Sequence, residues 1–472
     1  MRALVCLASL LWAVSLGAAV VRVPSQVPTI QGGIDYVGQG DTVLVAPGTY
    51  TIDRSLGFNG KGITVRSEAG AEATVIRMRR SGAPLGSIVV FQSGETSSSV
   101  LDGFTLEGGN SELHGGGIQC LEGTSPTLRN LIVQLNRTRY GGGMYCKNSS
   151  PTMIGCVLAR NHVTCGGGIF CDGASPTLIR CRIEGNRGFY AGTVHSKNGS
   201  TPHLRDCTII GNQTYYGGGV DSFQSAPVLV NCEIVGNVAS YGGAAYLSGG
   251  ELTIIHSTIV SNRCTQGPAV SEGVVLQNCL LWDNLNAVSS CAPSCIKDTD
   301  PLFLDAGEFA FGRYVAIDIT GTVEEMPDFI IRPPDLHLRA GSPAINKAAV
   351  LPEAPADLDG NRRPCGALAD FGARERCSQA ASFLRGDPSA DGTRDMSDAV
   401  GILTFLFIDA TAGLPCEKSA DLDDDGEVTL TDAVALLGHL YLGEPPIAEP
   451  SDSCGADTTE DMLACDSYPP CS

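Results

Sequence analysis

The sequence has few aromatic residues and few charges. Phe, Trp and Tyr make up 6% of its 472 residues, and Asp, Glu, Lys and Arg together make up 17%. Glycine is frequent instead, with 58 residues. This composition suits many short strands joined by tight turns better than a helical bundle. No patch rich in Lys and Arg stands out, so nucleic acid is not expected as a partner.

Basic residues are scarcest toward the C-terminus. Residues 386–472 contain 19 acidic and 2 basic residues, whereas the whole chain contains 51 acidic and 31 basic residues. The chain therefore consists of a nearly neutral body and an acidic C-terminal module. Its length is enough for two or three folded units.

Known catalytic signatures are also missing. The sequence has no GxSxG, HExxH or phosphate-binding loop, and no paired CxxC motifs of the kind that bind zinc. Motifs alone therefore do not decide whether the protein is an enzyme.

The N-terminus carries the one apolar run of note. Met1–Ala19 has the features of a signal peptide: Arg2 is the positive start, Ala3–Leu16 the apolar stretch and Gly17–Ala19 the cleavage site. We predict a protein that is secreted, extracellular or at the cell surface, with no membrane span after cleavage. The alternative is an N-terminal membrane anchor, for which the apolar stretch is short. Cleavage removes Cys6 and leaves 18 cysteines, an even number that fits an oxidising compartment.

In place of motifs the chain has a repeat of 25 or 26 residues. An apolar residue follows each glycine-rich turn, and an asparagine recurs at the same spacing. The apolar column is Ile118, Met144, Ile169, Val194, Val220, Ala245 and Val270. The asparagine column is Asn110, Asn136, Asn161, Asn186, Asn212, Asn237 and Asn262. Within each repeat, apolar and polar residues alternate with the period of strands, and Gly, Asn and Ser-Pro mark turns.

Such a repeat predicts a parallel β-helix, with one coil per repeat and coils stacked at about 4.8 Å. We expect apolar columns inside and the asparagines as an internal ladder of hydrogen-bonded amides. Two cysteine columns are expected to be small buried thiols, although adjacent coils could also form disulfides: Cys120, Cys146 and Cys171, and Cys156, Cys181, Cys207 and Cys232. Pro28–Val37 is expected to be a helix that covers the first coil. Residues 301–378 are expected to close the stack, with Cys365 and Cys377 as a local disulfide.

Two twelve-residue segments have the pattern of a calcium-binding loop, with oxygen-bearing residues around a glycine at position 6. The ligand candidates are Asp387, Ser389, Asp391, Thr393, Asp395 and Asp398 in the first loop, and Asp421, Asp423, Asp425, Glu427 and Asp432 in the second. The loops are 34 residues apart, and each runs into an apolar helix, Met396–Ile408 or Leu430–Leu442. This duplication predicts two bound Ca²⁺ ions. The alternative is two acidic turns without metal. The second loop has more carboxylates and is expected to bind more tightly.

The paired loops and helices resemble a type I dockerin module. That resemblance implies a small all-α, EF-hand-like unit that docks to a cohesin. The segment departs from the family by four further cysteines, Cys416, Cys454, Cys465 and Cys471. A cohesin-like protein, a cell-surface protein or an intramolecular contact therefore remain as partners.

The body carries a second resemblance. Residues 30–50 resemble the opening of pectin-lyase-like right-handed β-helix proteins, and the Gly-Gly-Gly, Ser-Pro-Thr and Asn repeats resemble the polymorphic-repeat branch of that superfamily. Residues 336–345 and 356–364 resemble the closing segment of bacterial surface-anchored β-helix proteins. Lyases, hydrolases, epimerases and non-catalytic adhesins share this fold, so the resemblance implies the fold and leaves the activity open.

The predicted fold is thus an all-β right-handed parallel β-helix with a small all-α dockerin-like module at the C-terminus. The predicted boundaries are a signal peptide at 1–19, an N-terminal cap and first coils at 20–110, regular repeats at 111–300, a closing segment at 301–378, and the module with its Cys-rich tail at 379–472.

Candidate site residues come from columns that should face outward. The sugar-binding candidates are Tyr145, Phe170, Tyr246, Tyr190, Tyr216 and Tyr241. Aromatic faces spaced along a stack can bind successive sugar rings, or they can simply pack on one another. His195 and Asp221 share one column on neighbouring coils, and Asp172 and Lys197 share the column two residues on. These four are the catalytic candidates, with His195 or Lys197 as base and Asp221 as its partner or a calcium ligand; a merely solvated histidine is the alternative.

Two functions follow from the sequence. The first is a secreted calcium-binding protein that contacts extracellular polysaccharide or a surface and is attached or assembled through the dockerin-like module. The second is a polysaccharide lyase or glycoside hydrolase of polysaccharide catabolism. A structural adhesin is hard to separate from the first by sequence.

Overall fold

The computed structural model describes residues 18–79, 86–284, 295–309, 330–339, 341–349, 351–365, 368–376, 383–408, 414–443, 446–455, 463, 465 and 468–471. The chain forms two compact units: Met1–Asp298 with Gly307–Pro333, and Thr299–Ala306 with Pro334–Ser472. The predicted signal peptide falls largely on residues 1–17, outside the described residues. Among the described residues, none of the helices has the length and apolar character needed to span a bilayer.

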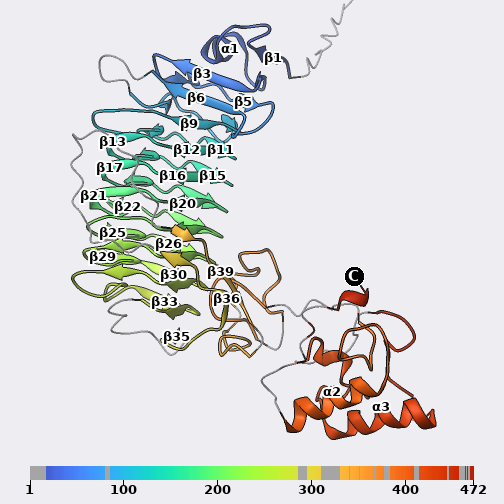
Figure 1. Ribbon diagram of the computed structural model, residues 1–472. Coiled ribbons are helices and arrows are strands. Elements are labelled where there is room, and N and C mark those ends of the chain that lie inside the picture. The colour runs from blue at the N-terminus through green and yellow to red at the C-terminus, as the bar shows by residue number, and fades with distance from the viewer. Residues whose placement is uncertain are drawn as a thin grey trace, which may run out of the picture. The chain divides into compact units, whose positions relative to one another are not determined.

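The first unit is a stack of coils whose strands form three long parallel sheets (Figure 1). Sheet A consists of β1 (Val20–Val23), β2 (Thr42–Val45), β5 (Thr64–Ser67), β8 (Val100–Asp102), β11 (Thr127–Arg129), β15 (Thr152–Ile154), β19 (Thr177–Ile179), β23 (His203–Arg205), β26 (Val228–Val230), β30 (Thr253–Ile255) and β33 (Val275–Gln277). Sheet B consists of β3 (Gly48–Ile52), β6 (Thr74–Met78), β9 (Thr105–Glu107), β12 (Ile132–Gln134), β16 (Val157–Ala159), β20 (Arg182–Glu184), β24 (Thr208–Ile210), β27 (Glu233–Val235), β31 (Thr258–Val260), β34 (Leu280–Trp282) and β35 (Ile296–Lys297). Sheet C consists of β4 (Leu56–Gly57), β7 (Val89–Phe91), β10 (Ile118–Leu121), β14 (Met144–Lys147), β18 (Ile169–Asp172), β22 (Val194–Lys197), β25 (Val220–Ser225) and β29 (Ala245–Gly250).

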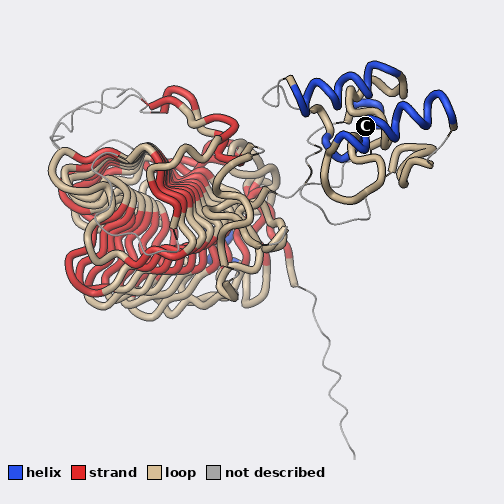
Figure 2. Tube along the Cα trace, turned by 90° about the horizontal axis from the view of Figure 1, so that it is seen from below, coloured by secondary structure: helices blue, strands red, loops and turns tan. Residues whose placement is uncertain are grey.

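Smaller parallel sheets form in the turns between sheets B and C. One consists of β13 (Arg137–Tyr140), β17 (His162–Cys165) and β21 (Arg187–Ala191), and another of β28 (Val238–Ala239) and β32 (Arg263–Cys264). β37 (Glu308–Phe309) and β38 (Ile330–Arg332) form an antiparallel pair in the same unit. A view down the stack shows the strands of successive coils lying over one another (Figure 2). The prediction of a right-handed parallel β-helix followed by a small helical region is therefore confirmed.

The apolar columns fill the interior, as predicted. Ile118, Leu128 and Val133, one from each wall of the same coil, are fully buried. Their equivalents on the next coil, Met144, Met153 and Leu158, pair with them in register. Because alternate residues of a strand point to opposite faces, the residues beside these columns lie on the outer faces.

The asparagine column forms the predicted internal ladder. Asn161 Nδ2 donates to Oδ1 of Asn186 at 3.0 Å, and Asn186 Nδ2 donates to Oδ1 of Asn212 at 3.1 Å. Each amide also bonds to the backbone, as Asn186 Nδ2 does to the Leu158 carbonyl at 2.8 Å. The ladder runs from Asn136 to Asn284. Asn110 was expected in this column but is exposed, and the backbone of Gly109 bonds to Asn136 in its place.

Glycine is favoured in the turns before sheet C because the coils approach one another closely there. A Cβ on Gly143 would lie 2.5 Å from the carbonyl oxygen of Gly168 on the next coil. The first glycine of the triplet, Gly141, has a φ of +70°, in the left-handed region. The described cysteines of the two columns are free and buried, as expected.

The N-terminal end of the stack is covered by helix α1 (Ile30–Tyr36), which confirms the helix predicted at Pro28–Val37. Thr29 caps it by accepting a hydrogen bond from the Gly32 amide at 3.0 Å. Ile30 and Ile34 are buried in the core of the first coils. The open strand edge is thereby covered.

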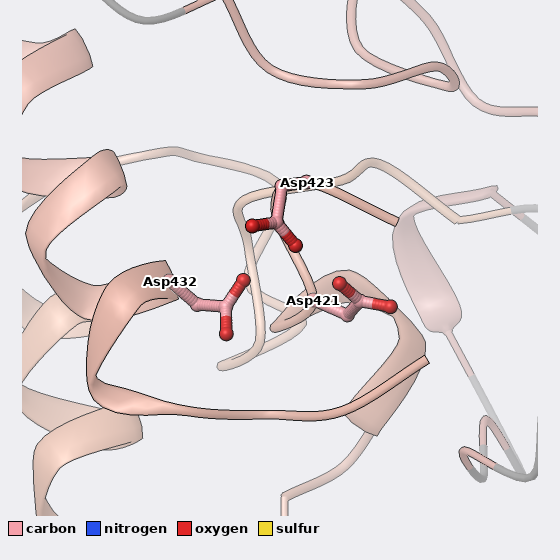
Figure 3. A group of neighbouring side chains, drawn as sticks. All are labelled: Asp421, Asp423 and Asp432. Carbon is pink, nitrogen blue, oxygen red and sulfur yellow. The ribbon is translucent and has the colours of Figure 1, made fainter. Parts of the chain in front are cut away.

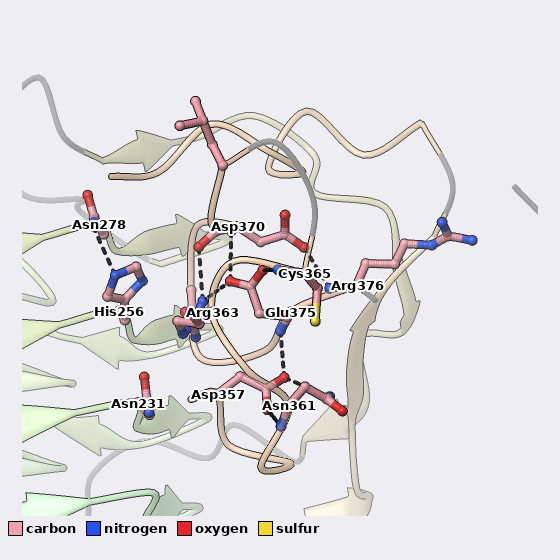
Figure 4. A network of polar contacts seen from close by, with 12 residues as sticks. Asn231, His256, Asn278, Asp357, Asn361, Arg363, Cys365, Asp370, Glu375 and Arg376 are labelled. Atoms are coloured by element: carbon pink, nitrogen blue, oxygen red, sulfur yellow. Dashed lines mark hydrogen bonds and ion pairs between the residues drawn. The ribbon is translucent and has the colours of Figure 1, made fainter. Parts of the chain in front are cut away.

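The second unit begins with loops around the antiparallel pair β36 (Phe303–Asp305) and β39 (Asp335–Leu338). Within these loops, Arg363 and Glu375 form a buried ion pair (Figure 4). Arg363 Nη2 also donates to the Gly372 carbonyl at 2.8 Å, and Glu375 accepts from the Asp370 amide at 2.8 Å. Cys365 is disulfide-bonded, and its predicted partner Cys377 lies outside the described residues.

The remainder of this unit holds helices α2 (Met396–Phe407) and α3 (Leu430–Leu442) and the 3₁₀ turns Glu417–Ser419 and Pro469–Cys471. Ile402 of α2 and Leu436 of α3 are fully buried in their shared core. The Cys416–Cys465 disulfide joins the C-terminal tail to the rest of the module, and the Cys454–Cys471 disulfide lies within the tail. The predicted domain boundaries remain predictions; the compact units place residues 334–376 with the helices.

Candidate functional site

The outer face of sheet C carries a column of polar and aromatic side chains. Parallel pairing in register aligns Tyr145 with Phe170, Phe170 with His195, His195 with Asp221, and Asp221 with Tyr246. Gln119 begins the column on β10. The alternating neighbours, Cys146 and Cys171 among them, are buried inside. The column predicted from the repeat is therefore present, with its members aligned in register; we call it the sheet C column.

A second column precedes the glycine turns and packs against the first. Tyr140 contacts Phe170 with ring centroids 5.1 Å apart, and Tyr216 contacts Tyr246 at 4.9 Å. Along the stack, Tyr145 and Phe170 lie 5.5 Å apart and nearly parallel, as do Tyr216 and Tyr241. Aromatic pairs at these distances stabilise each other. The two columns form a strip of two groups of contacting rings, separated by the polar pair His195 and Asp221.

The exposed area of this strip is unevenly distributed. Tyr145 and Phe170 are only 3% exposed, because the turn folds back over them and the second column covers them. They therefore offer little of their ring faces to solvent, although the column lies on the outer face. Tyr190 is 53% exposed, and Tyr216, Tyr241 and Tyr246 are half-buried. A sugar-binding role of these six residues stays a prediction, and the accessible rings are the four at the end nearer β29.

His195 and Asp221 form a direct pair. Nδ1 of His195 lies 2.8 Å from Oδ2 of Asp221, and both side chains are nearly buried. The amide of Gly192 donates a second hydrogen bond to the same carboxylate oxygen at 3.3 Å. In the tautomer with its proton on Nδ1, His195 donates to Asp221, and Nε2 keeps its lone pair. The pair thus has the arrangement of a histidine that can accept a proton, with Asp221 orienting it.

Asp172 and Lys197 form a second pair beside the first. Lys197 Nζ lies 3.2 Å from Asp172 Oδ2 and 5.1 Å from the centre of the Phe170 ring. Asn198 Nδ2 also donates to Asp172 at 2.6 Å. Burial, followed by the charge of Asp172 and a hydrogen bond to it, raises the pKa of Tyr145 well above its usual value. The four catalytic candidates thus lie on three neighbouring strands, β18, β22 and β25.

The coil that carries His195 is irregular. Its turn has Ala191-Gly192-Thr193 where the neighbouring coils have three glycines or their equivalent. The first glycine of the other turns is left-handed, as at Gly166 (φ +69°) and Gly217 (φ +57°), whereas Ala191 is not. The register between β17 and β21 shifts as a result, so that Cys165 pairs with Ala191 instead of Tyr190. Such irregularities re-aim side chains and are frequent next to functional sites. The replacement of the first glycine by Ala191 was the signal in the sequence for this change.

The second loop of the helical module brings its carboxylates together (Figure 3). Asp421, Asp423 and Asp432 each place an oxygen within 4.8 Å of the others. Gly426 has a φ of +87° and donates to Asp421 Oδ2 at 3.0 Å, which closes the turn. Burial, opposed by backbone hydrogen bonds and assisted by the charge of Asp432, raises the pKa of Asp421 to about 6.

The first loop has the same backbone design. Gly392, with a φ of +88°, donates to Asp387 Oδ2 at 2.8 Å, and Ser389 Oγ donates to Asp387 Oδ1 at 3.0 Å. At position 12 of each loop, Asp398 and Asp432 form the capping boxes at the starts of α2 and α3. Oxygen ligands around a sharp glycine turn are what Ca²⁺ requires, so the clustered carboxylates of the second loop fit the ion. The first loop has the same glycine turn and oxygen-bearing side chains at the corresponding positions. Asp391, Thr393, Asp395, Asp425 and Glu427 remain ligand candidates.

The two helices present equivalent exposed apolar residues. Met396, Val400 and Phe407 of α2 are each more than half exposed, and Leu430, Val434 and Tyr441 of α3, 34 positions later, are each at least half exposed. Buried positions on the same helices, Ile402 and Leu436, are likewise 34 residues apart. The duplication in sequence thus yields two matching apolar surfaces.

A match to a protein-family model agrees with the fold. Residues 87–262 match the protein family described as right handed beta helix region. Among solved structures, the chain is similar to the pectate lyase Pel9A, with 17% identity over 74% of this chain and 90% of the lyase and a TM-score of 0.45. It is also similar to the pectin methylesterases of Aspergillus niger (12% identity, 50% and 86% covered, TM-score 0.34) and carrot (11%, 61% and 90%, 0.34). No curated protein matches the sequence.

Proposed function

We propose that this chain is a secreted calcium-binding β-helix protein that binds extracellular polysaccharide along the outer face of sheet C and is attached through its C-terminal module. The observation that carries the proposal is the strip of rings that follows the sheet C column over successive coils. Strands in such a stack repeat every 4.7–4.9 Å or so, which gives a rigid, regular surface along which an extended polymer can lie.

The chemistry of the strip suits sugars. Aromatic faces stack on the apolar faces of sugar rings, and phenol, imidazole and carboxylate groups bond to sugar hydroxyls. Tyr190, Tyr216, Tyr241 and Tyr246 are accessible, and the His195–Asp221 pair lies beside them. The ladder of coils fixes all of these groups before the polymer arrives, so little conformational entropy is lost on binding.

This part of the proposal is tested by retention of the full chain on insoluble polysaccharides, followed by competition with soluble fragments. Replacing Tyr190 and Tyr246 by Ala is expected to abolish retention. Tyr36, 75% exposed on α1 and remote in sequence from the strip, provides the matched control Tyr36→Ala. Equal retention of the Tyr190→Ala/Tyr246→Ala variant and the control would show that the strip does not bind the polysaccharide.

Calcium binding and attachment belong to the C-terminal module. The two loops supply the ligands for two Ca²⁺ ions, and the matching apolar surfaces of α2 and α3 suit a protein partner, such as a cohesin-like or cell-surface protein. Because the surfaces are equivalent, either helix can contact the same kind of partner. A double variant, Val400→Asp with Val434→Asp, is expected to abolish partner binding, whereas each single variant retains one surface.

A second candidate function is cleavage of the bound polysaccharide by elimination or hydrolysis. The specific observation in its favour is the His195–Asp221 pair beside the irregular turn, because a carboxylate that accepts from Nδ1 orients a histidine that can take up a proton at Nε2. Lys197 supplies a positive charge nearby, paired to Asp172. Turnover that is lost in His195→Gln and retained in Tyr36→Ala would establish it.

A further inference from the structure

The end of the chain folds back onto the first calcium loop. Tyr468 is buried, and its hydroxyl donates a hydrogen bond to Oδ2 of Asp387, 81 residues earlier in the chain. Asp387 occupies position 1 of the first loop and is fully buried. A residue from outside the twelve-residue loop therefore contacts one of its principal ligand candidates.

The two oxygens of Asp387 have different partners. Oδ2 accepts from the Gly392 amide at 2.8 Å and from Tyr468, whereas Oδ1 is bonded by Ser389 Oγ at 3.0 Å and the Asp391 amide at 3.3 Å. Ser389 and Asp391 are themselves ligand candidates, so Oδ1 is on the side of the loop where an ion would lie. Tyr468 holds the other oxygen and so fixes Oδ1 on the side of these ligand candidates.

The second loop has a different group in the same place. Asp421 Oδ2 accepts from the Gly426 amide at 3.0 Å and lies 4.0 Å from Nη1 of Arg385, which is fully buried. Each position-1 carboxylate thus has a buried polar side chain behind the oxygen that bonds to glycine. In the second loop this side chain is Arg385, which precedes both loops in sequence. In the first loop it is Tyr468, which belongs to the tail.

The tail is held in place covalently. The Cys416–Cys465 disulfide joins it to the segment between the loops, and the Cys454–Cys471 disulfide closes it on itself. Phe383, Cys416, Cys465 and Tyr468 form one buried cluster. Pro470 lies against Gly392, 3.4 Å from where a Cβ would be. The position of the Tyr468 hydroxyl therefore depends on the disulfides.

We propose that the disulfide-bonded tail is a structural part of the first calcium site, with Tyr468 as a positioning residue that orients Asp387. The inference rests on the calcium binding proposed above and adds a dependence of the first loop on the oxidised tail. Its physical basis is that hydrogen bonds to the outer atoms of a ligand fix its direction toward the metal. The first loop has Ser389 where the second has Asp423, so it has one carboxylate fewer and depends more on the orientation of those that remain.

The test is calorimetric titration of the full chain with calcium chloride at fixed ionic strength. Asp387→Asn and Asp421→Asn identify the binding step of each loop. Tyr468→Phe is expected to weaken binding to the first loop by about tenfold and to leave the second loop unchanged. Cys416→Ser with Cys465→Ser is expected to produce the same selective loss. Tyr36→Phe removes a hydroxyl from an exposed tyrosine of α1 and is the matched control.

The possible outcomes distinguish the role of Tyr468 from calcium binding itself. Two unchanged binding steps in Tyr468→Phe would overturn the role of Tyr468, and so would an equal loss at both loops, because Tyr468 would then support the whole module. Binding at the second loop reports that the variant module is folded. A wild-type chain that binds no calcium would refute the proposed calcium function and the inference with it.

Discussion

His195 and Asp221 lie on adjacent coils, in register, with Nδ1 of the histidine 2.8 Å from Oδ2 of the aspartate. The pairing follows from the 26-residue step between them, which superimposes their strands. Both side chains are nearly buried, so their interaction is weakly screened by water. This pair is the polar group within the sheet C column, which we propose binds polysaccharide.

The pair predicts a measurable coupling in stability. Among the described residues, His195→Ala leaves the buried Asp221 carboxylate with the Gly192 amide as its hydrogen-bond donor, and it is expected to cost about 1–3 kcal/mol of the free energy of unfolding. Asp221→Ala removes the other partner. The double variant should be less destabilised than the sum of the two single variants. Urea unfolding of the four proteins measures this, and strict additivity would mean that the pair does not interact.

The asparagine ladder predicts a large loss of stability from one substitution. Asn186→Ala removes the amide that bonds to Asn161, Asn212 and the Leu158 carbonyl, and leaves their buried polar atoms unsatisfied. The expected cost is about 3 kcal/mol. Asn110→Ala, at an exposed position outside the ladder, should have almost no effect. Similar urea midpoints for the two variants would contradict the ladder as a stabilising element.

His162 predicts a loss of stability in mild acid. Burial, and then the charges of Arg187 and Arg137 on the flanking strands, lower its pKa from 6.5 to about 4. Below pH 6.5 the unfolded chain therefore binds a proton at His162 that the folded chain does not bind. Folding stability contributed by the neutral histidine is present above pH 6.5 and falls as the pH drops to 4, by up to about 3 kcal/mol.

The measurement is the urea midpoint of unfolding at pH 7.5 and pH 4.5. His162→Gln is expected to reduce the difference between the two midpoints, because glutamine does not titrate. His203→Gln, at an exposed position on β23, is the control and should keep the wild-type difference. If His162→Gln and His203→Gln lose stability equally on acidification, the environment of His162 is not as described.

Calcium is expected to stabilise the C-terminal module. An ion that binds only the folded state at a hundred times its dissociation constant adds about 2.7 kcal/mol per site. Chelation should therefore lower the unfolding temperature of the module in differential scanning calorimetry. Asp421→Asn should remove the part of this shift that is due to the second loop, and Glu272→Gln, exposed on the solenoid, should leave it unchanged. An unfolding profile that is the same with and without chelator would contradict both calcium sites.

The repeat explains why so much of the solenoid could be predicted from the sequence. Residues 25 or 26 apart occupy the same place on successive coils, so the columns of Ile118, Asn136 and His195 could be read directly as contacts. The burial of Tyr145 could not be predicted from the repeat. It depends on how the turn before sheet C folds over its own strand and on packing by the second column. The position of Tyr190 could not be predicted either, because it depends on the register shift at Ala191.

The C-terminal module shows a different limit. The loop motifs, their 34-residue spacing and the following helices are local patterns, and the helices are present as predicted. The pairing of Cys416 with Cys465 and of Cys454 with Cys471 is not local, since four cysteines allow three pairings. The contact of Tyr468 with Asp387 follows from that pairing and has no signal of its own in the sequence.

The central claim is that the outer face of sheet C binds polysaccharide. Its most direct test is retention of the full chain on a panel of insoluble pectins, alginates and neutral and sulfated glycans, with reducing ends and double-bond absorbance followed in the same samples. The account predicts retention on one class of glycan that is lost in Tyr190→Ala/Tyr246→Ala and kept in Tyr36→Ala. Retention on no glycan, or retention that the paired substitution leaves intact, would contradict it.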